Sequence, residues 1–295
     1  HPAAAADATA ALAVRVNGGD PVVRGAAFAA LGVVAEAAPH RATPVAGAAV
    51  AALDDPDDVV AAGAAQVVAG VADERPDAVR EAVPTLAAGI ESGRVPPAAL
   101  VRGLDRIGAG YPAAVLPAVD VLLDHAESTG ASGRMAALSA VGRVASRHPS
   151  ALEPSVERLT ALFDDDRREL RAGAAMVLAD VTSHCPAVVA PLTERVVTLL
   201  ADAETDAVRG PATAVLAGLA RTRPERVRDA RAVDPLVGAL SADETDTRSN
   251  AAWILGRIGA RDARDVLAAR RQDDPAAEVR EAASWALDRL EESAE

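Results

Sequence analysis

The sequence predicts an all-α protein, and within that class an α-solenoid of about eight antiparallel helix pairs. Three observations lead to this prediction: a proline recurs every 36 to 38 residues, an arginine recurs in step with it, and small apolar residues abound. Half of the 295 residues are hydrophobic although only 2% are aromatic, so the core must consist of Ala, Val and Leu. A fixed repeat of this length is typical of proteins in which each unit buries its apolar face on its neighbours.

The prolines mark the corners where one helix pair ends and the next begins. Proline is accepted in the first turn of a helix, but in the interior it removes a hydrogen bond and clashes with the preceding turn. The residue before it is also held away from the helical conformation. Six prolines follow one another at intervals of 37, 36, 37, 37 and 38 residues: Pro39, Pro76, Pro112, Pro149, Pro186 and Pro224.

An arginine opens most of the expected second helices, and we call its place the register position. Alanine stands three residues after it and leucine or valine seven residues after it, so both lie on one helix face. The small residue at the third position permits close approach of a neighbouring helix. The second and third pairs depart from the pattern, because Ala61 and Pro97 occupy the register position there. The register arginines are Arg24, Arg134, Arg171, Arg209, Arg248 and Arg280.

The motif Val-Arg-x-x-Ala-Ala-x-Ala-Leu resembles the second helix of HEAT-repeat proteins. Residues 23–31, 208–216 and 279–287 match its valine, arginine, first alanine and leucine. The resemblance covers essentially the whole chain and implies one right-handed superhelix over residues 1–295. Its helix pairs are expected at residues 2–38, 41–73, 76–110, 113–147, 150–184, 187–222, 225–259 and 262–292.

The resemblance also implies how the repeats are joined and which surface they offer. In HEAT arrays the second helix lines the concave side, and recurring Asp and Arg residues pair between neighbouring repeats. The register arginines are therefore expected to form a structural ladder. The last two pairs, around residues 252–259, resemble the shorter HEAT-like repeat named after phycocyanobilin lyases. The candidate aspartates of the ladder are Asp20, Asp57, Asp166, Asp206, Asp246 and Asp274.

The charge composition predicts adaptation to concentrated salt. The chain carries 43 acidic residues against 30 basic ones, for a net charge of −13, and every basic residue is arginine. Aspartate outnumbers glutamate. This combination resembles the proteins of halophilic archaea, whose cytoplasm is rich in potassium chloride; coding by a GC-rich genome is the alternative explanation. Concentrated salt screens surface charges within a few ångströms, so the acidic excess costs little there.

Few residues have the spacing of a catalytic or metal site. The sequence contains no Gly-rich phosphate loop, no serine or cysteine triad pattern and no zinc spacing. We interpret Cys185, the one cysteine, as an unreactive residue at a helix end. Trp253 and Trp285 each lie five residues after a register arginine. Packing is the favoured interpretation of this pair, and a cofactor site is the alternative.

One corner is rich in arginine. Such a group can bind a phosphate or an acidic partner segment, while a solvated corner with local ion pairs is the simpler interpretation. Nucleic-acid binding is disfavoured, because both halves of the chain are acidic and a basic face with aromatic residues is lacking. The five arginines proposed to bind a partner are Arg221, Arg223, Arg226, Arg228 and Arg231.

These features favour a non-enzymatic scaffold that presents a curved helical surface to a protein partner. The alternatives are an enzyme or enzyme accessory with a small cofactor, and a nucleic-acid binder that uses the arginine-rich corner. The favoured interpretation requires no cofactor and no metal. No apolar run is long enough to span a membrane. Because the first residues lack the charged start and dense apolar core of a signal peptide, a cytoplasmic location is expected.

The predicted salt adaptation has a direct test. Raising KCl from about 0.1 M to about 3 M should raise the temperature of half-unfolding by about 10 °C or more, because salt screens carboxylate repulsion and strengthens apolar burial. Far-ultraviolet circular dichroism follows the loss of helix. A midpoint that stays constant or falls over this range would contradict halophilic adaptation and favour the explanation from genome composition.

Overall fold

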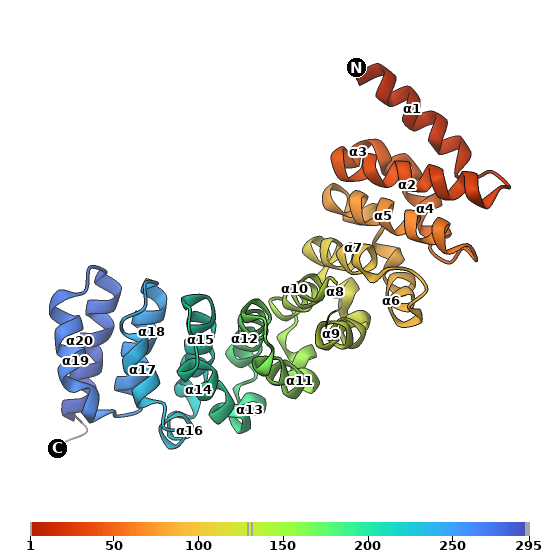
Figure 1. Ribbon diagram of the computed structural model, residues 1–295. Coiled ribbons are helices and arrows are strands. Elements are labelled where there is room, and N and C mark those ends of the chain that lie inside the picture. Colours follow the sequence, from red (N-terminus) through yellow and green to blue (C-terminus); the bar gives the residue numbers. More distant parts are fainter. Residues whose placement is uncertain (1, 129, 131, 293–295) are drawn as a thin grey trace. The chain divides into compact units, whose positions relative to one another are not determined.

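The computed structural model describes residues 2–128, 130 and 132–292, with side chains from Thr9 onward, and these residues form helices joined by short turns (Figure 1). No strand occurs among them. The prediction of an all-α repeat solenoid is confirmed. No helix in the described ranges is both long enough and apolar enough to cross a membrane.

The chain divides into two compact units, His1–His148 and Pro149–Glu295, and each is considered by itself. Among the described residues, each unit contains four helix pairs. A first helix leads through an intra-pair turn into a second helix, and a corner then leads into the next pair. The expectation of one continuous superhelix over residues 1–295 stays a prediction.

Unit 1 contains four second helices, one continuous first helix and three first helices that are interrupted. The second helices are α2 (Pro21–Ala37), α5 (Asp58–Glu74), α7 (Pro97–Gly110) and α10 (Arg134–Ala145). The first helices are α1 (Pro2–Arg15); α3 (Pro39–Ala42), η1 (Thr43–Val45) and α4 (Ala46–Ala52); η2 (Pro76–Ala78), η3 (Arg80–Ala82) and α6 (Val83–Ser92); and α8 (Pro112–Val115), η4 (Leu116–Ala118) and α9 (Val119–Glu127).

Unit 2 follows the same plan. Its second helices are α12 (Arg168–His184), α15 (Asp206–Thr222), α18 (Thr245–Arg257) and α20 (Ala277–Glu292). Its first helices are η5 (Pro149–Ser155), α11 (Val156–Ala161) and η6 (Leu162–Asp164); α13 (Pro186–Val189), η7 (Ala190–Leu192) and α14 (Thr193–Ala201); α16 (Pro224–Asp229) and α17 (Val233–Ala239); and η8 (Arg261–Ala263) and α19 (Arg264–Asp273).

The first helices are less regular than the proline period alone suggests. In four pairs a second proline stands five residues after the corner proline, within a 3₁₀ segment. Proline cannot donate the hydrogen bond that an α-helix needs at that place, so the chain tightens into a 3₁₀ turn before the helix resumes. These second prolines are Pro44, Pro117, Pro154 and Pro191.

Aspartates in the intra-pair turns start two second helices of unit 1. The Asp20 carboxylate accepts a hydrogen bond from the N–H of Val22 at 2.9 Å. The Asp57 carboxylate accepts from the N–H groups of Val59 and Val60 at 2.9 and 3.2 Å. These N–H groups have no partner within the helix, and a carboxylate also complements the positive helix end. The two aspartates are therefore N-caps of α2 and α5.

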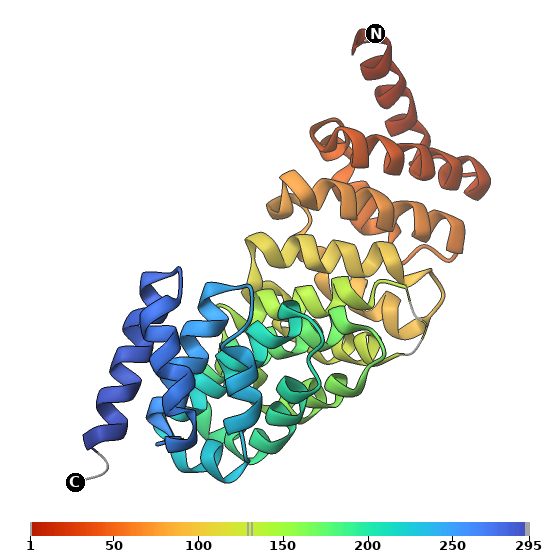
Figure 2. The same ribbon diagram turned by 60° about the vertical axis from the view of Figure 1, so that its left-hand side comes forward.

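Second helices lie side by side, as Figure 2 shows for α2, α5 and α7. They pack against one another through small residues. The alanines at the third position and the leucines or valines at the seventh are at most 3% exposed. Glycine allows a still closer approach. A Cβ added to Gly70 would lie 2.5 Å from the Cβ of Ala35, and one added to Gly256 would lie 2.5 Å from the Cα of Ala286.

This close approach predicts opposite effects for two glycine-to-alanine substitutions in unit 2. Gly256→Ala should lower the free energy of unfolding by about 1–3 kcal/mol, because the added methyl group would push α18 away from α20. Gly238→Ala in α17, where an added Cβ meets nothing within 4 Å, should leave it unchanged or raise it by about 0.5–1 kcal/mol. Urea titration measures both. Equal effects of the two substitutions would contradict the packing described.

Candidate interaction surface

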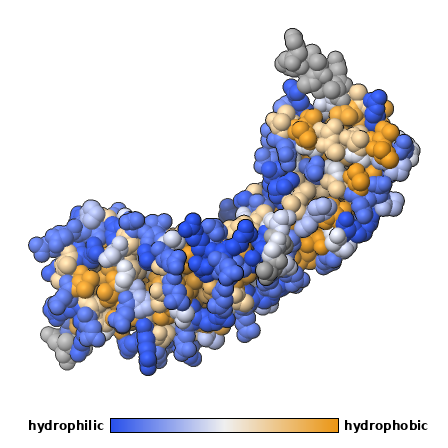
Figure 3. Space-filling model, viewed as in Figure 1, coloured by the Kyte–Doolittle hydropathy of each residue, from blue (hydrophilic) through white to orange (hydrophobic). Residues whose placement is uncertain are grey.

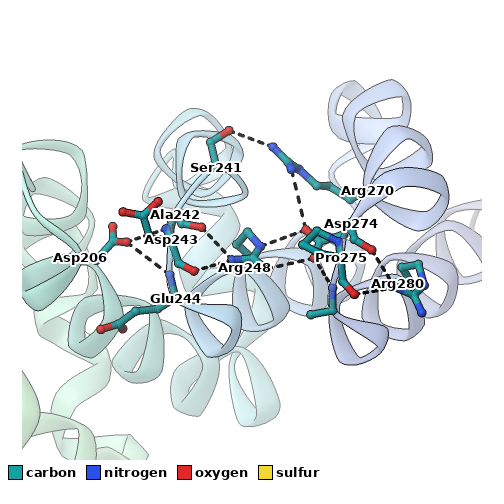
Figure 4. Close-up of polar contacts among 11 residues, drawn as sticks. Asp206, Ser241, Ala242, Asp243, Glu244, Arg248, Arg270, Asp274, Pro275 and Arg280 are labelled. Atoms are coloured by element: carbon teal, nitrogen blue, oxygen red, sulfur yellow. Dashed lines mark hydrogen bonds and ion pairs between the residues drawn. The ribbon is translucent and has the colours of Figure 1, made fainter.

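An extensive polar network of unit 2 surrounds Arg248 at the start of α18 (Figure 4). Its guanidinium donates to both carboxylate oxygens of Asp274 at 2.9 and 3.0 Å. It also donates to the backbone carbonyls of Ala242 and Asp243 at 2.9 and 2.8 Å. The ion pair is buried, with side-chain exposures of 8% for Arg248 and 0% for Asp274. Because Asp274 belongs to the next intra-pair turn, this arginine joins two neighbouring pairs.

The register arginines share a contact with their own intra-pair turn. Five of them donate to the backbone carbonyl six residues earlier, near the end of the first helix, where carbonyls lack a helical partner. Arg134 differs, because it donates to the carbonyl of Ala126, eight residues earlier, at 2.6 Å. The five bonds are Arg24 to Gly18 (3.3 Å), Arg171 to Asp165 (2.8 Å), Arg209 to Ala203 (2.9 Å), Arg248 to Ala242 (2.9 Å) and Arg280 to Asp274 (2.7 Å).

The register arginines Arg24 and Arg248 also bind a carboxylate of the following pair. Arg248 binds Asp274, and Arg24 binds Asp55 at 2.7 Å. Asp55 is not among the aspartates expected to form the ladder. In the acidic run before α5, Asp57 is occupied as the helix cap, and Asp55 is the residue whose side chain reaches the preceding pair.

The other expected ladder aspartates have different positions. Asp20 caps α2. Asp206 pairs with Arg209 of its own helix, and its second oxygen accepts the backbone N–H of Asp243 in the next turn at 2.6 Å. Asp166 and Asp246 are exposed. The neighbouring turns of unit 2 are thus joined partly through backbone groups.

A second series of arginines joins neighbouring second helices and was missed in the sequence. Each lies nine residues after the register position and reaches the second helix of the preceding pair. Arg106 donates to the Ala69 carbonyl at 2.7 Å, Arg143 to the Asp105 carboxylate at 2.7 Å, and Arg257 to the Ala220 carbonyl at 3.2 Å. The signal was the nine-residue spacing of Arg134 from Arg143 and of Arg248 from Arg257.

Arg248 and Asp274 hold each other in the charged state. Burial alone would raise the pKa of Asp274, but hydrogen bonds from Arg248 and from the N–H of Ala276 outweigh it, so the pKa lies below the ordinary value of 3.8. The hydrogen bond to Asp274 likewise raises the pKa of Arg248. The pair therefore stabilises the fold throughout the neutral range.

Large apolar side chains that remain exposed gather on the second helices. Val14 of α1 is the exception among the described residues. The space-filling view shows apolar surface over α2 and α5 (Figure 3). The exposed residues on second helices are Val22, Val23, Val33, Val59, Met135, Met176 and Trp285.

Most of these residues lie at four helix positions that recur from pair to pair, and we call this set the second-helix stripe. It comprises the positions two residues before the register position and two, five and nine residues after it, which lie above one another on a helix. In unit 1 the stripe carries Val22 and Val33 on α2 and Val59 on α5. In unit 2 its fifth-position row carries Met176, Ala214, Trp253 and Trp285.

Trp253 and Trp285 stack on each other at the C-terminal end of this row. Their ring centroids lie 5.7 Å apart, with an angle of 15° between the planes. Such a pair contributes about 0.5–1.5 kcal/mol beyond its buried area. Trp285 is still 38% exposed. The rings therefore pack as expected from the sequence and also present apolar surface to solvent.

Charged residues flank the apolar row of unit 2 on both sides. Towards the intra-pair turns, the position two before the register carries Glu169, Asp246 and Glu278, all exposed. Towards the corners, the position nine after the register carries Arg257 and Arg289 on the last two helices. The stripe of α18 and α20 is thus acidic at one end, apolar in the middle and basic at the other.

The arginine-rich corner lies between α15 and α17. Arg228 donates to the carbonyl of Ile258, at the end of the second helix of its own pair, at 2.6 Å, so this arginine has a structural role. The other four arginines are exposed: Arg221, Arg223, Arg226 and Arg231. None of the five lies on the second-helix stripe.

The described residues contain no group of three or more His, Cys, Asp or Glu side chains arranged to hold a metal ion. Cys185 lies 3.3 Å from the Ser150 hydroxyl. That hydrogen bond lowers the pKa of the thiol, but Glu153 and burial raise it by more, so the pKa lies above its ordinary value. A thiol in this setting stays protonated and is a poor nucleophile.

The family model of HEAT repeats matches residues 193–288. Residues 193–288 contain HEAT repeats. The matched region runs from α14 into α20, so the HEAT repeats include the Arg248 network, the stacked tryptophans and the arginine-rich corner.

One of two similar solved structures shows the same fold. An engineered protein whose crystal structure was determined by a structural genomics consortium has a TM-score of 0.83 at 22% identity, over 96% of this chain and 78% of that one. A designed armadillo repeat protein has a TM-score of 0.49 at 18% identity, over 84% of this chain and 98% of that one. No curated protein matches the sequence.

Loss of one partner of the buried ion pair should destabilise these HEAT repeats. Asp274→Asn should lower the free energy of unfolding by about 3 kcal/mol at neutral pH, because it leaves Arg248 buried without a counter-charge. Asp273→Asn, at an exposed neighbour, should change it by less than about 0.5 kcal/mol. Urea titration measures both variants.

The same variant has a defined pH dependence. The wild-type advantage is the amount by which its free energy of unfolding exceeds that of Asp274→Asn. Because the pKa of Asp274 is lowered on folding, this advantage is fully present above the ordinary pKa of 3.8. It should shrink as the pH falls below that value towards the folded pKa. An advantage that is constant down to about pH 3, or that grows on acidification, would contradict the assigned ion pair.

Proposed function

We propose that the chain is a non-enzymatic scaffold that binds a partner protein through the second-helix stripe. The HEAT-type solenoid fold is commonly used in this way, because stacked helix pairs form an extended surface without needing a single deep pocket. The observation that carries the proposal is the placement of the exposed large apolar residues. With the exception of Val14, those among the described residues lie on second helices.

This placement is not explained by packing within the repeats. The buried faces of the second helices are already filled by the alanines and leucines of the third and seventh positions. Met176 is 59% exposed and Val33 is 69% exposed, so their apolar surface lies in water. Full burial of one such side chain by a partner would stabilise the complex by about 1.5–3 kcal/mol. Aromatic and methionine side chains are also enriched in the cores of protein interfaces.

The charges of unit 2 indicate the kind of segment that fits. A segment lying across α18 and α20 would place apolar side chains on Trp253 and Trp285. Its basic side chains would meet Asp246 and Glu278 at the turn end, and its acidic side chains would meet Arg257 at the corner end. Such complementarity steers association and fixes the orientation of a partner more than it adds affinity.

A pair of matched variants tests the role of the stripe in partner binding. Trp285→Ala should weaken binding of the partner recovered from the source cells by about tenfold or more, because a partly exposed aromatic anchor is lost. Val14→Ala, on the one first helix with an exposed large apolar residue, should change the affinity by less than about twofold. Both affinities are measured from the binding of the purified partner to each surface-immobilised variant. Equal affinities of the two variants would contradict the proposal.

The two tryptophans also report directly on the stripe. They are the only tryptophans of the chain, so intrinsic fluorescence arises from this surface. Binding of a tryptophan-free fragment of the partner should shift the emission to shorter wavelength, because Trp285 leaves water. Saturating binding with an unchanged spectrum would place the contact elsewhere on the molecule.

A further inference from the structure

One corner of unit 2 carries positive charge that the chain does not neutralise. Residues 221–231 contain five arginines and two acids, so the corner is positive in a chain of net charge −13. Arg228 is used structurally. The side chains of the remaining four are exposed and form no hydrogen bond or ion pair with a described residue: Arg221, Arg223, Arg226 and Arg231.

This lack of partners distinguishes the corner from the rest of unit 2. Most arginines of this unit, even exposed ones, hold a carboxylate or a carbonyl. Arg195 binds Asp164, for example, and Arg264 binds Glu291. Outside the corner, the arginine side chains of described unit 2 residues without a hydrogen bond or ion pair are Arg167 and Arg271. Free guanidinium groups are therefore concentrated in one eleven-residue segment.

Arg231 is held in a backbone conformation that disfavours a side chain. Its φ is +60°, which makes it the one described non-glycine residue with a positive φ. The other described positions of this kind carry glycine: Gly93, Gly130, Gly133 and Gly259. A Cβ is strained in the left-handed region, and strain of this sort is often found at binding sites. Glycine would suit the turn better, so the arginine contributes something other than folding stability.

The same corner borders an open pocket of about 550 Å³ between α14 and the start of α17. Arg231 is part of its lining, together with two acids. Its other lining residues are a threonine and four apolar residues, so the lining is mixed, with apolar side chains beside charged ones. The lining residues are Glu194, Val197, Thr198, Ala201, Asp229, Ala230, Arg231 and Pro235.

We propose that this corner binds an acidic segment of a partner protein. Carboxylates of the segment contact Arg221, Arg223, Arg226 and Arg231, and an apolar side chain of the same segment enters the adjoining pocket. Guanidinium groups suit this role because each can donate two parallel hydrogen bonds to one carboxylate. The chain as a whole repels polyanions, which confines binding to a short segment at this corner.

A protein segment fits this corner better than a nucleic acid does. Glu194 and Asp229 lie in the lining of the pocket, so the pocket suits the uncharged apolar side chain of a protein segment, and the anionic groups of the segment must lie outside it on the arginines. Residues 221–231 contain no aromatic side chain on which a base could stack. The corner is also separate from the second-helix stripe, so this inference does not depend on the proposed function of the stripe.

Fluorescence anisotropy of a labelled peptide tests the proposal with the full chain. The probe is a synthetic peptide of about twelve residues, rich in Glu and carrying one central Leu. The double variant Arg223→Gln, Arg226→Gln should bind it about tenfold or more weakly than the wild type, because two charge-assisted contacts are lost. The matched control Arg271→Gln removes an exposed, unpaired arginine outside the corner and should change the affinity by less than about twofold.

Arg231→Gly separates binding from folding. This variant should bind the peptide at least about threefold more weakly, while its unfolding temperature stays the same or rises because glycine relieves the left-handed conformation. Trp285→Ala should leave peptide binding unchanged, because Trp285 lies on the stripe and not at the corner. The proposal for the corner can therefore fail while the proposal for the stripe holds, and the reverse.

Several results would overturn the proposal. One is equal peptide affinity of the wild type and the Arg223→Gln, Arg226→Gln variant. Another is that the wild type binds a control peptide with Gln in place of Glu as tightly as it binds the Glu-rich peptide. Tighter binding of a single-stranded DNA of the same charge would assign the corner to nucleic acid instead. A last result is that the wild type does not bind the peptide but self-associates in sedimentation, whereas the double variant stays monomeric. In that case the occupant of the corner is a second copy of this chain.

Discussion

Neighbouring second helices approach each other so closely that only very small side chains fit between them. Added Cβ atoms on Gly70 and Gly256 would lie 2.5 Å from atoms of the adjacent helix. This constraint explains the alanine three residues after each register arginine and the near absence of aromatic residues from the core. Because the buried faces are so uniform, the repeats can differ from one another chiefly in their turns, corners and exposed rows.

Arginine supplies the polar connections that such a core cannot. At the register position it closes the intra-pair turn by binding carbonyls that the helix leaves unsatisfied. At Arg24 and Arg248 it also binds a carboxylate of the next pair. Nine residues later a second arginine, as in Arg143, reaches the preceding second helix. A planar fork with five donors can serve a carbonyl and a carboxylate together, which a lysine cannot do with the same geometry.

The fold was predictable from the sequence because its signals are strictly periodic. Corner prolines and the register arginines report on helix ends and helix faces, and both are local properties. The partner of Arg24 was not predictable in the same way. Four aspartates stand between residues 54 and 58, and the path of the turn decides that Asp57 caps α5 while Asp55 points to the preceding pair.

The candidate site was predictable only in part, for a related reason. The corner arginines and the two tryptophans stand out as residues, but their exposure depends on which neighbours they meet. The side chain of Arg228 donates a hydrogen bond to a carbonyl 30 residues away in the chain, whereas the side chain of Arg226 has no partner among the described residues. The motif does not show which valines are exposed, because Val23 is exposed on α2 whereas Val208, at the same place in the motif, is buried. The exposed valines of α2 and α5 become a surface only because second helices stack side by side.

The central claim is that differences among the second helices form the contact surface for a partner. Photo-crosslinking from single positions tests it most directly, with a benzophenone amino acid placed at position 176 or 285 of the stripe, or at position 241 at the end of a first helix. The account predicts that positions 176 and 285 crosslink to one and the same partner, both in the source-cell extract and with the purified partner. Position 241 should not crosslink to it. Crosslinks to that partner from position 241 alone, or equally from all three positions, would contradict it.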